Sequence, residues 1–260
     1  MSIKMIAVDL DETLLRSDKT ISNFTAEILR ICQQHGILIV FATARSESDC
    51  KQYIDVINPD AIISNRGAIV RVGNNIIHRV AIDVETTNKI LRSCLKQPNV
   101  RYIYAYTDTG YFFNVPEAEH DPVNWGEYNH DRYTDFSQGL KCDAYKITVE
   151  ICDGMTADAI ASSFPTVDVI RFSGEPFYSF GNKSISKWEG IKILAAHLSI
   201  NTKDILAFGD DYSDIDMLRE CGIGVAVANA ISEVKAVADY VCCENNRDGV
   251  AKWIKENAIY

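Results

Sequence analysis

The stretch that decides the fold is Met5-Ile6-Ala7-Val8-Asp9-Leu10-Asp11-Glu12-Thr13. Its four leading apolar residues are typical of a short buried strand, and two carboxylates follow where that strand ends. Carboxylates in such a place are costly unless a cation or a reaction uses them. In an open parallel α/β sheet, ligands bind at the carboxyl ends of the strands. The stretch therefore predicts a site at the sheet edge, although an Asp-rich turn accounts for these residues equally well when they are considered alone.

The rest of the chain alternates buried strands with amphipathic helices. Further strands, apolar on both faces as in a parallel sheet covered by helices, are predicted at 37–42, 61–63, 205–208 and 224–227. Helices are predicted at 24–32, after 46, after 186, at 215–221, at 231–238 and after 248. Ser22, Ser46 and Ser186 are expected to cap three of them, the last two with an acid three residues on, as in a capping box. The pattern predicts an α/β fold with a parallel sheet.

The pattern of apolar and polar residues changes after residue 67. Alternating and aromatic stretches predict hairpins at 68–72, 75–80, 100–106 and 111–115, and helical runs occur at 86–95 and 156–164. The aperiodic segment 119–128, which contains Trp125, is predicted to be a loop. We therefore expect an α/β core over 1–82 and 183–260, with an α+β domain inserted over 83–182.

Composition excludes several classes of protein. The net charge of −10 over 260 residues disfavours binding to nucleic acid. No apolar run reaches the roughly 20 residues that span a bilayer, and the N-terminus lacks the pattern of a secretory signal, so we expect a cytoplasmic protein without membrane contact. The eight cysteines and five histidines form no cluster with metal-ligand spacing, which favours reduced thiols over zinc ligands. A monomer or a small homo-oligomer is expected.

Polar groups follow the predicted strands, or begin the helices, in a definite order: Asp9 and Asp11, then Thr43, Lys187, Asp210, Asp211 and Asp214. If the strands are parallel, these groups meet at one edge of the sheet. So many carboxylates cannot all stay ionised without a cation, and oxygen ligands of this hardness select Mg²⁺. The alternative for the last three acids is an acidic segment before a helix, which the helix dipole favours.

Lys187 supplies an independent argument, because a cation in the first turn of a helix opposes the helix dipole. A bound anion removes the conflict, so Lys187, the Thr43 hydroxyl and nearby backbone N–H groups are expected to hold a phosphate. Lys183 is a rival for this role, and an exposed surface lysine is the alternative. On this reasoning, replacing Lys187 by methionine should leave stability unchanged or slightly improved.

Four motifs together resemble the haloacid dehalogenase (HAD) superfamily. They are D-L-D-E-T-L-L at 9–15, F-A-T-A-R at 41–45, S-K-W-E-G-I at 186–191 and G-D-D-Y-S-D-I-D-M-L at 209–218. The later G-V-A-V-A-N-A at 224–230 and D-G-V-A at 248–251 are similar to the Cof-type branch of sugar-phosphate and cofactor phosphatases. The resemblance implies a Rossmann-like core with a large inserted cap domain that governs substrate specificity.

The resemblance also implies roles for individual residues. Asp9 matches the nucleophile that forms an aspartyl-phosphate, and Asp11 matches the general acid and base. The carboxylates of Asp9 and Asp210, with the backbone carbonyl of Asp11, match the Mg²⁺ ligands, and Asp214 matches the acid that positions the metal and its waters. The phosphate-holding set is Thr43, Ala44, Lys187 and Ser213.

Two positions depart from the branch. Ser213 stands where the branch usually has asparagine, and Arg66 interrupts the usual S-N-G-A. We expect Arg66 to face solvent rather than to bind a second anionic group of the substrate.

The predicted function is that of a Mg²⁺-dependent phosphatase acting on small phosphomonoesters. Sugar phosphates and phosphorylated cofactors such as pyridoxal phosphate or FMN are the expected substrates. A phosphomutase and a non-catalytic phosphometabolite-binding regulator are the alternatives. The paired acids Asp9 and Asp11 argue against the regulator, because a binding protein needs no acid and base.

Overall fold

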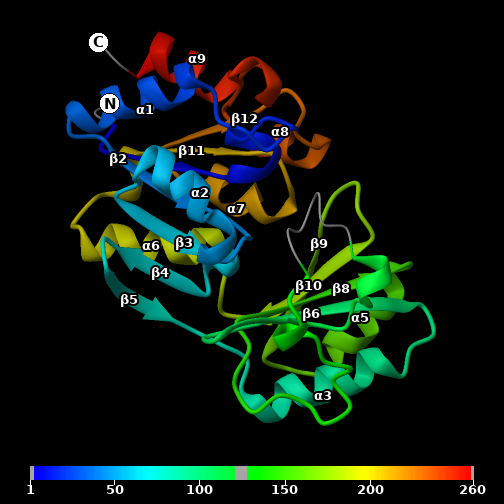
Figure 1. Cartoon of the computed structure of the whole chain (residues 1–260). Helices are drawn as coiled ribbons and strands as arrows, with labels where there is room; N and C mark the ends of the chain where they lie inside the picture. Colours follow the sequence, from blue (N-terminus) through cyan, green and yellow to red (C-terminus); the bar gives the residue numbers. More distant parts are fainter. Residues whose placement is uncertain (1–2, 121–127, 259–260) are drawn as a thin grey trace. The chain divides into compact units, whose positions relative to one another are not determined.

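The first apolar run forms β1 (Met5–Val8), a central strand of an eight-stranded sheet. The structure, a computed structural model, describes residues 3–120 and 128–258. The chain divides into one unit made of residues 1–79 and 185–260 and a second made of residues 80–184 (Figure 1). The sequence predicted an insertion over 83–182.

The sheet of the first unit has the order β13-β12-β11-β1-β2-β3-β4-β5. It is parallel from β13 to β3, and its last two strands are antiparallel. The remaining strands are β2 (Leu38–Ala42), β3 (Ala61–Ser64), β4 (Ile69–Val72), β5 (Asn75–Arg79), β11 (Ile205–Gly209), β12 (Ile223–Ala226) and β13 (Tyr240–Val241). The prediction of a parallel sheet therefore holds for six of the eight strands, and the hairpin predicted at 68–80 extends one edge.

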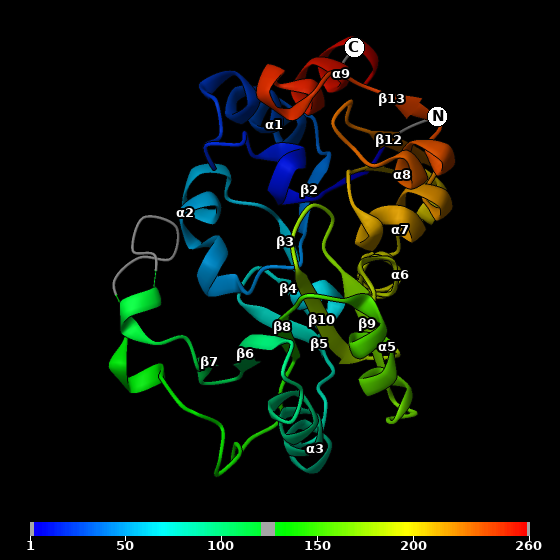
Figure 2. The ribbon, with the colours of Figure 1, turned by 90° about the vertical axis from the view of Figure 1, so that its right-hand side faces the viewer.

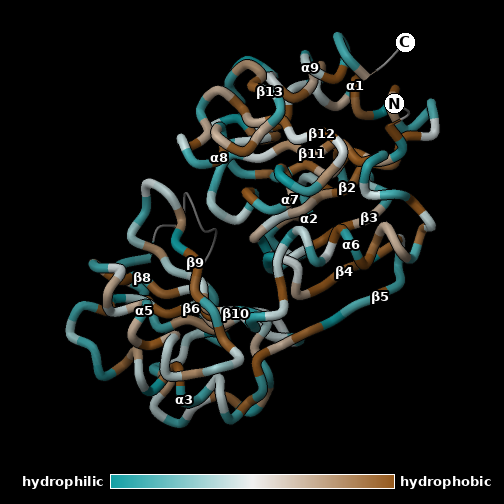
Figure 3. The backbone as a smooth tube through the Cα atoms, turned by 180° about the vertical axis from the view of Figure 1, so that it is seen from behind, coloured by the Kyte–Doolittle hydropathy of each residue, from teal (hydrophilic) through white to brown (hydrophobic). Residues whose placement is uncertain are grey.

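Helices cover both faces of this sheet. All four residues of β1 are fully buried although successive side chains point to opposite faces. One group of helices consists of α1 (Asn23–Gln34), α2 (Glu47–Ile57) and α9 (Gly249–Asn257), and another of α6 (Lys187–His197), α7 (Ile215–Glu220) and α8 (Ser232–Val237). Hydrophobic stretches of the chain lie in the sheet layer, with hydrophilic ones in the connections (Figure 3). The predicted α/β fold is confirmed.

The predicted caps form at the starts of three helices. The Ser22 hydroxyl accepts a hydrogen bond from the backbone of α1, and Ser46 forms a complete capping box with Asp49 at α2. Ser186 caps α6, but the reciprocal half of its box is missing because the Glu189 carboxylate pairs with Lys192 instead. The cap that places α6 is therefore the serine alone.

In its described residues, the second unit consists of a five-stranded antiparallel sheet with the order β7-β6-β8-β10-β9 and the helices α3 and α5 (Figure 2). Its elements are α3 (Val84–Leu95), β6 (Val100–Thr107), β7 (Gly110–Phe113), β8 (Lys146–Ile151), α5 (Gly154–Ser162), β9 (Val167–Arg171) and β10 (Phe177–Asn182). One face of the sheet packs on both helices in an apolar core of its own. Sequence analysis predicted the helices and β6 and β7 but did not resolve β8, β9 and β10. Trp125 and most of its predicted loop lie outside the described residues.

Within the described ranges, no helix is both long enough and apolar enough to span a membrane.

Candidate active site

The register of three adjacent strands brings the predicted site residues to one edge of the sheet. Val8 of β1 lies opposite Phe41 of β2 and Phe208 of β11, and all three strands run parallel. The backbone N–H of Asp9 donates to the Phe208 carbonyl at 3.1 Å, which continues the ladder one residue past β1. Asp9 and Asp210 therefore leave the sheet side by side, as the sequence predicted.

A buried lysine lies between two of the acids. The Lys187 Nζ atom is 2.6 Å from Asp9 Oδ1 and 2.6 Å from Asp214 Oδ1, and the lysine is only 1% exposed. The carboxylates of Asp9, Asp210 and Asp214 are all buried, with one oxygen of each within 4.8 Å of the others. Lys187, in the first turn of α6, therefore faces two carboxylates of the protein itself, those of Asp9 and Asp214.

Asp214 is held by the loop that it closes. Its Oδ2 atom accepts backbone N–H bonds from Asp210 at 3.0 Å and from Asp211 at 3.1 Å. A side chain at Gly209 would clash with that of Asp214, so the glycine is needed for this close approach. Because both oxygens of Asp214 already have donors, its carboxylate is built into the frame of the site.

Thr13 is a member of the site to which the sequence analysis gave no role. Its buried hydroxyl donates to Asp210 Oδ1 at 2.7 Å across 197 residues of sequence. The residue stands in the opening motif, two positions after Asp11, but nothing local indicates its partner. The contact orients the Asp210 carboxylate from the side of the first loop.

Burial dominates the electrostatics of the cluster. It raises the pKa of Asp9 to about 7 even though the charge of Lys187 opposes the shift. Burial, reinforced by the charges of Asp9 and Asp214, raises the pKa of Asp210 to about 9. Burial alone would lower the pKa of Lys187, but the two carboxylates beside it outweigh that effect and raise it. One lysine therefore does not neutralise the three acids.

Three buried carboxylates, of which two pair with one lysine, are a donor set that fits Mg²⁺. Their oxygens are hard ligands, and a divalent cation would remove the excess of negative charge. Asp9 and Asp210 each have one carboxylate oxygen that accepts a hydrogen bond and one that accepts none from a described residue, whereas both oxygens of Asp214 accept hydrogen bonds.

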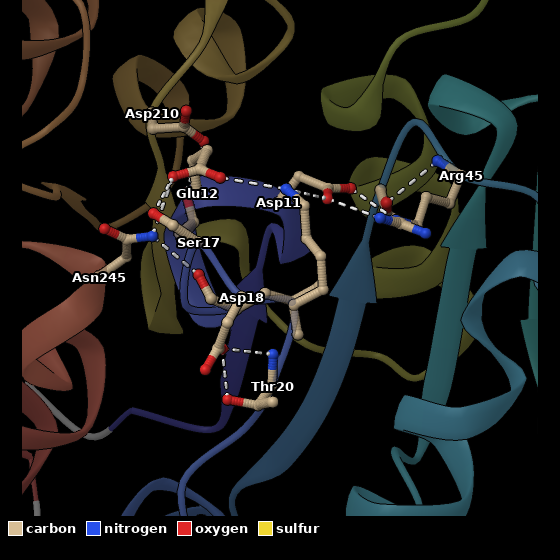
Figure 4. Close-up of polar contacts among 12 residues, drawn as sticks. Asp11, Glu12, Ser17, Asp18, Thr20, Arg45, Asp210 and Asn245 are labelled. Atoms are coloured by element: carbon tan, nitrogen blue, oxygen red, sulfur yellow. Dashed lines mark hydrogen bonds and ion pairs between the residues drawn. The ribbon is translucent and has the colours of Figure 1, made fainter. Parts of the chain in front are cut away.

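Asp11 lies outside this cluster, and its side chain is 38% exposed. The carboxylate faces Arg45, which follows β2 (Figure 4). It also pairs with Lys19 on the first loop. Burial would raise the pKa of Asp11, but the hydrogen bonds and charges of Arg45 and Lys19 outweigh it and lower the pKa. The two acids of the opening motif, alike in sequence, thus stand in opposite environments.

The predicted phosphate-holding residues differ in their surroundings. Thr43 is buried directly after β2, where its hydroxyl accepts the Arg45 N–H at 3.1 Å, and Ala44 is half-buried beside it. Ser213 is half-buried, and its hydroxyl makes no hydrogen bond to any described residue. The rival Lys183 is exposed and belongs to the second unit.

The expectation for Arg66 is wrong, since this residue is only 1% exposed. Asn65, Arg66 and Gly67 all have positive φ angles, of 50°, 63° and 103°, so the backbone turns sharply after β3. The Arg66 N–H donates to the Thr43 carbonyl at 3.1 Å, and Gly67 lies so close to the Ser186 carbonyl that a Cβ atom would clash. This turn ties the loop that carries Thr43 to the start of α6 and directs Arg66 inward.

Comparison with known proteins agrees with this geometry. The family model of haloacid dehalogenase-like hydrolases matches residues 6–254. The stress response protein YhaX of Bacillus subtilis is 27% identical over 98% of this chain and 93% of its own length. The 5-amino-6-(5-phospho-D-ribitylamino)uracil phosphatase YbjI of Escherichia coli is 27% identical over 96% and 94%. The structure of the HAD subclass IIB sugar phosphatase BT4131 superposes with a TM-score of 0.83 at 26% identity, over 99% of this chain and 100% of that one. A match over nearly the whole chain, with the motif residues gathered at one sheet edge, shows that this protein belongs to the haloacid dehalogenase-like hydrolase family.

Proposed function

We propose that this protein is a Mg²⁺-dependent phosphatase that hydrolyses small phosphomonoesters through an aspartyl-phosphate at Asp9. The observation that carries the proposal is the buried cluster of Asp9, Asp210 and Asp214 around Lys187. Phosphoryl transfer asks a protein mainly for in-line positioning and neutralisation of charge. A lysine beside an excess of carboxylates, which a divalent cation would balance, supports both requirements.

The carboxylates of Asp9 and Asp210 and the backbone carbonyl of Asp11 would hold the metal, while Thr13 and Asp214 position that set. When bound, Mg²⁺ would neutralise charge on the phosphoryl oxygens. Thr43, Ala44, Lys187 and Ser213 are the residues proposed to hold the phosphate.

In the first step, Asp9 attacks phosphorus. Its Oδ1 atom accepts from Lys187, whereas Oδ2 makes no hydrogen bond to a described residue and is the proposed nucleophile. A bond forms from this oxygen to phosphorus as the ester P–O bond breaks. Asp11, whose pKa is lowered by Arg45 and Lys19, takes up a proton from solvent before it gives a proton to the leaving oxygen. A water oxygen then bonds to phosphorus as the bond between phosphorus and Asp9 Oδ2 breaks. Asp11 takes a proton from that water, the Asp9 carboxylate is restored, and inorganic phosphate leaves.

The substrate class is proposed from the relatives and the inserted domain. Relatives of this chain include 5-amino-6-(5-phospho-D-ribitylamino)uracil phosphatases and a sugar phosphatase. Phosphorylated sugars, sugar alcohols and cofactors such as pyridoxal phosphate or FMN are therefore the first compounds to try. We propose that the inserted domain, residues 83–182, selects among them.

The test compares wild-type protein with the Asp9→Asn and Asp11→Asn variants on 4-nitrophenyl phosphate and on a panel of phosphorylated metabolites, with Mg²⁺ or with a chelator. We expect turnover only with Mg²⁺, no phospho-enzyme for Asp9→Asn, and slow turnover with some trapped phospho-enzyme for Asp11→Asn. Acid-quench mass spectrometry measures the intermediate. Undiminished activity in excess chelator, or a phosphorylated Asp9→Asn protein, would refute the proposal. A requirement for a bisphosphate activator would indicate a phosphomutase instead, and binding without turnover would indicate a regulator.

A further inference from the structure

Asp11, the proposed general acid and base, forms ion pairs with two cations, Arg45 and Lys19. Arg45 Nε lies 2.6 Å from Asp11 Oδ2, and Arg45 Nη2 lies 2.7 Å from Oδ1. Lys19 Nζ is 3.2 Å from the same Oδ1. Figure 4 shows the carboxylate and the guanidinium facing each other across the gap between the first loop and the end of β2. A two-pronged pair of this kind fixes the plane of a carboxylate as well as its position.

Arg45 is itself held in place from several sides. Its backbone N–H donates to the Thr43 hydroxyl at 3.1 Å, and its carbonyl accepts from the Asn65 N–H at 2.8 Å. The guanidinium lies over the Tyr53 ring of α2, 5.6 Å from the ring centroid. The arginine therefore presents a preorganised fork to Asp11, and that fork stands on the same short loop as Thr43.

Lys19 is anchored through Glu12, the neighbour of Asp11. The Glu12 carboxylate accepts from Lys19 Nζ at 3.0 Å, from the Ser17 hydroxyl at 3.0 Å and from Asn245 Nδ2 at 3.1 Å (Figure 4). Asn245 is buried and also donates to the Leu15 carbonyl at 2.9 Å. Hydrogen bonds from Asn245 thus hold the loop that carries Asp11 against the C-terminal part of the chain. The Lys19 ammonium group contacts both Glu12 and Asp11 of this loop.

From this geometry we propose that Arg45 is the positioning residue for Asp11, with Lys19 in a supporting role. The inference rests on the proposed function. A general acid must lie within hydrogen-bond reach of the atom that it protonates, and a misplacement of about 1 Å can cost on the order of 10²-fold in rate. The backbone on either side of Asp11 is packed, with Leu10 and Thr13 buried, but the Asp11 side chain is 38% exposed and its carboxylate is held by ion pairs rather than by packing. The fork of Arg45 therefore sets where this carboxylate lies. Arg45, which positions Asp11, and Thr43, which is proposed to bind the phosphate, stand on one loop. The distance between the proton donor and the phosphate is therefore set by that loop.

A purely structural role predicts something different. The Asp11 and Arg45 side chains are 38% and 27% exposed, and an ion pair so open to water contributes only about 0 to 1 kcal/mol to folding. An Arg45 variant should therefore fold, and its effect should appear in catalysis. Arg71 provides a matched control, because its Nε atom also lies 2.6 Å from a half-exposed carboxylate, that of Glu47, without touching Asp11.

The experiment measures kcat/KM of wild-type, Arg45→Gln, Arg45→Lys, Lys19→Gln and Arg71→Gln proteins. The substrates are 4-nitrophenyl phosphate and phenyl phosphate, which have similar shapes but leaving groups of different basicity. For an aspartyl-phosphate mechanism kcat/KM reports the first chemical step, which needs acid help most when the leaving group is basic. We expect Arg45→Gln to lose about 10- to 100-fold on phenyl phosphate and clearly less on the nitrophenyl ester. Arg45→Lys should recover part of this loss, Lys19→Gln should show a smaller loss of the same pattern, and Arg71→Gln should match wild type.

A double-mutant cycle then tests whether Arg45 acts through Asp11. In an Asp11→Asn background, Arg45→Gln should cost less than about twofold, because the group that it positions is already gone. An equal loss on both esters, or the same loss with and without Asp11, would overturn the inference and leave the proposed function intact. If wild-type protein hydrolyses neither ester and no panel compound, both proposals fail.

Discussion

Replacing Lys187 by methionine removes the cation that lies between two buried carboxylates. The Nζ atom is 2.6 Å from Asp9 and 2.6 Å from Asp214, and neither acid has solvent to replace it. Removing one partner of a buried ion pair typically costs about 3 to 5 kcal/mol, because a charge is left buried without compensation. Relief of the helix-dipole conflict returns only about 0.3 to 1 kcal/mol. The structure therefore reverses the expectation from sequence, and Lys187→Met should be strongly destabilising as well as inactive.

The loss in the free energy of unfolding caused by Lys187→Met should depend on pH and on the burial of the lysine. Measured by urea unfolding of the metal-free protein, it should be largest near pH 8 and smaller near pH 5, where the orphaned carboxylates can take up protons. Lys192→Met is the matched control, since Lys192 on the same helix makes a 2.7 Å pair with exposed Glu189 and should cost less than about 1 kcal/mol. Equal losses for the two lysine variants, or a loss at Lys187 that is the same at both pH values, would refute the reasoning.

Three further predictions concern the carboxylates of the cluster. The raised pKa values of Asp9 and Asp210, about 7 and about 9 against an ordinary 3.8, mean that the folded protein binds protons more tightly than the unfolded chain. Without metal, stability should therefore fall as the pH rises from 4 through this range, and Mg²⁺ should raise the melting temperature more at pH 8.5 than at pH 5.5; equal shifts would contradict this. Thr13→Val removes the donor to Asp210 and should weaken Mg²⁺ binding by about 10- to 100-fold in calorimetry, whereas an unchanged affinity would show that the hydroxyl does not orient the ligand. Gly209→Ala should push Asp214 out of place, with a loss of about 1 to 3 kcal/mol in unfolding and a loss of activity, and a variant that keeps both would contradict the close approach.

The sequence was most informative where the signal is local. Short apolar runs and helix periodicity gave the strands and helices of the first unit to within a few residues, because burial on both faces leaves a plain apolar pattern. The Ser46–Asp49 box also formed as predicted, since both partners lie within one turn. In the inserted domain β8, β9 and β10 were not resolved. These strands mix polar and apolar residues, and in β8 and β10 polar side chains such as Lys146, Thr148 and Ser179 are themselves buried, so the sequence shows neither an apolar run nor a clear alternation.

The site was predicted only as far as parallel strands bring the residues that follow them to one edge of the sheet. Because β1 and β11 are parallel, Asp9 and Asp210, which follow them, lie at the same edge, and this could be predicted from the sequence. The hydrogen bonds of these two acids were not predicted, because they depend on where side chains point: Lys187 was expected to face a bound phosphate but donates to Asp9, and Thr13 was given no role but donates to Asp210. Arg66 was misread for a related reason. The direction of the Arg66 side chain depends on three successive positive φ angles, at Asn65, Arg66 and Gly67. Of these, only Gly67 is a residue type whose presence in a sequence commonly indicates a positive φ.

The places where local rules are broken gather around Asp11. Eight non-glycine residues with positive φ occur in the described parts of the chain, and four of them are Glu12, Lys19, Asn65 and Arg66. Such conformations cost about 1 kcal/mol or more each and persist only where the surrounding structure enforces them. Two of these residues shape the loop that carries Asp11, and the other two form the turn that holds the carbonyls of Thr43 and Arg45. The strain therefore borders the ion pair between Asp11 and Arg45 on both sides. That arrangement is expected if the position of one carboxylate, rather than the stability of either loop, is what the two loops must maintain.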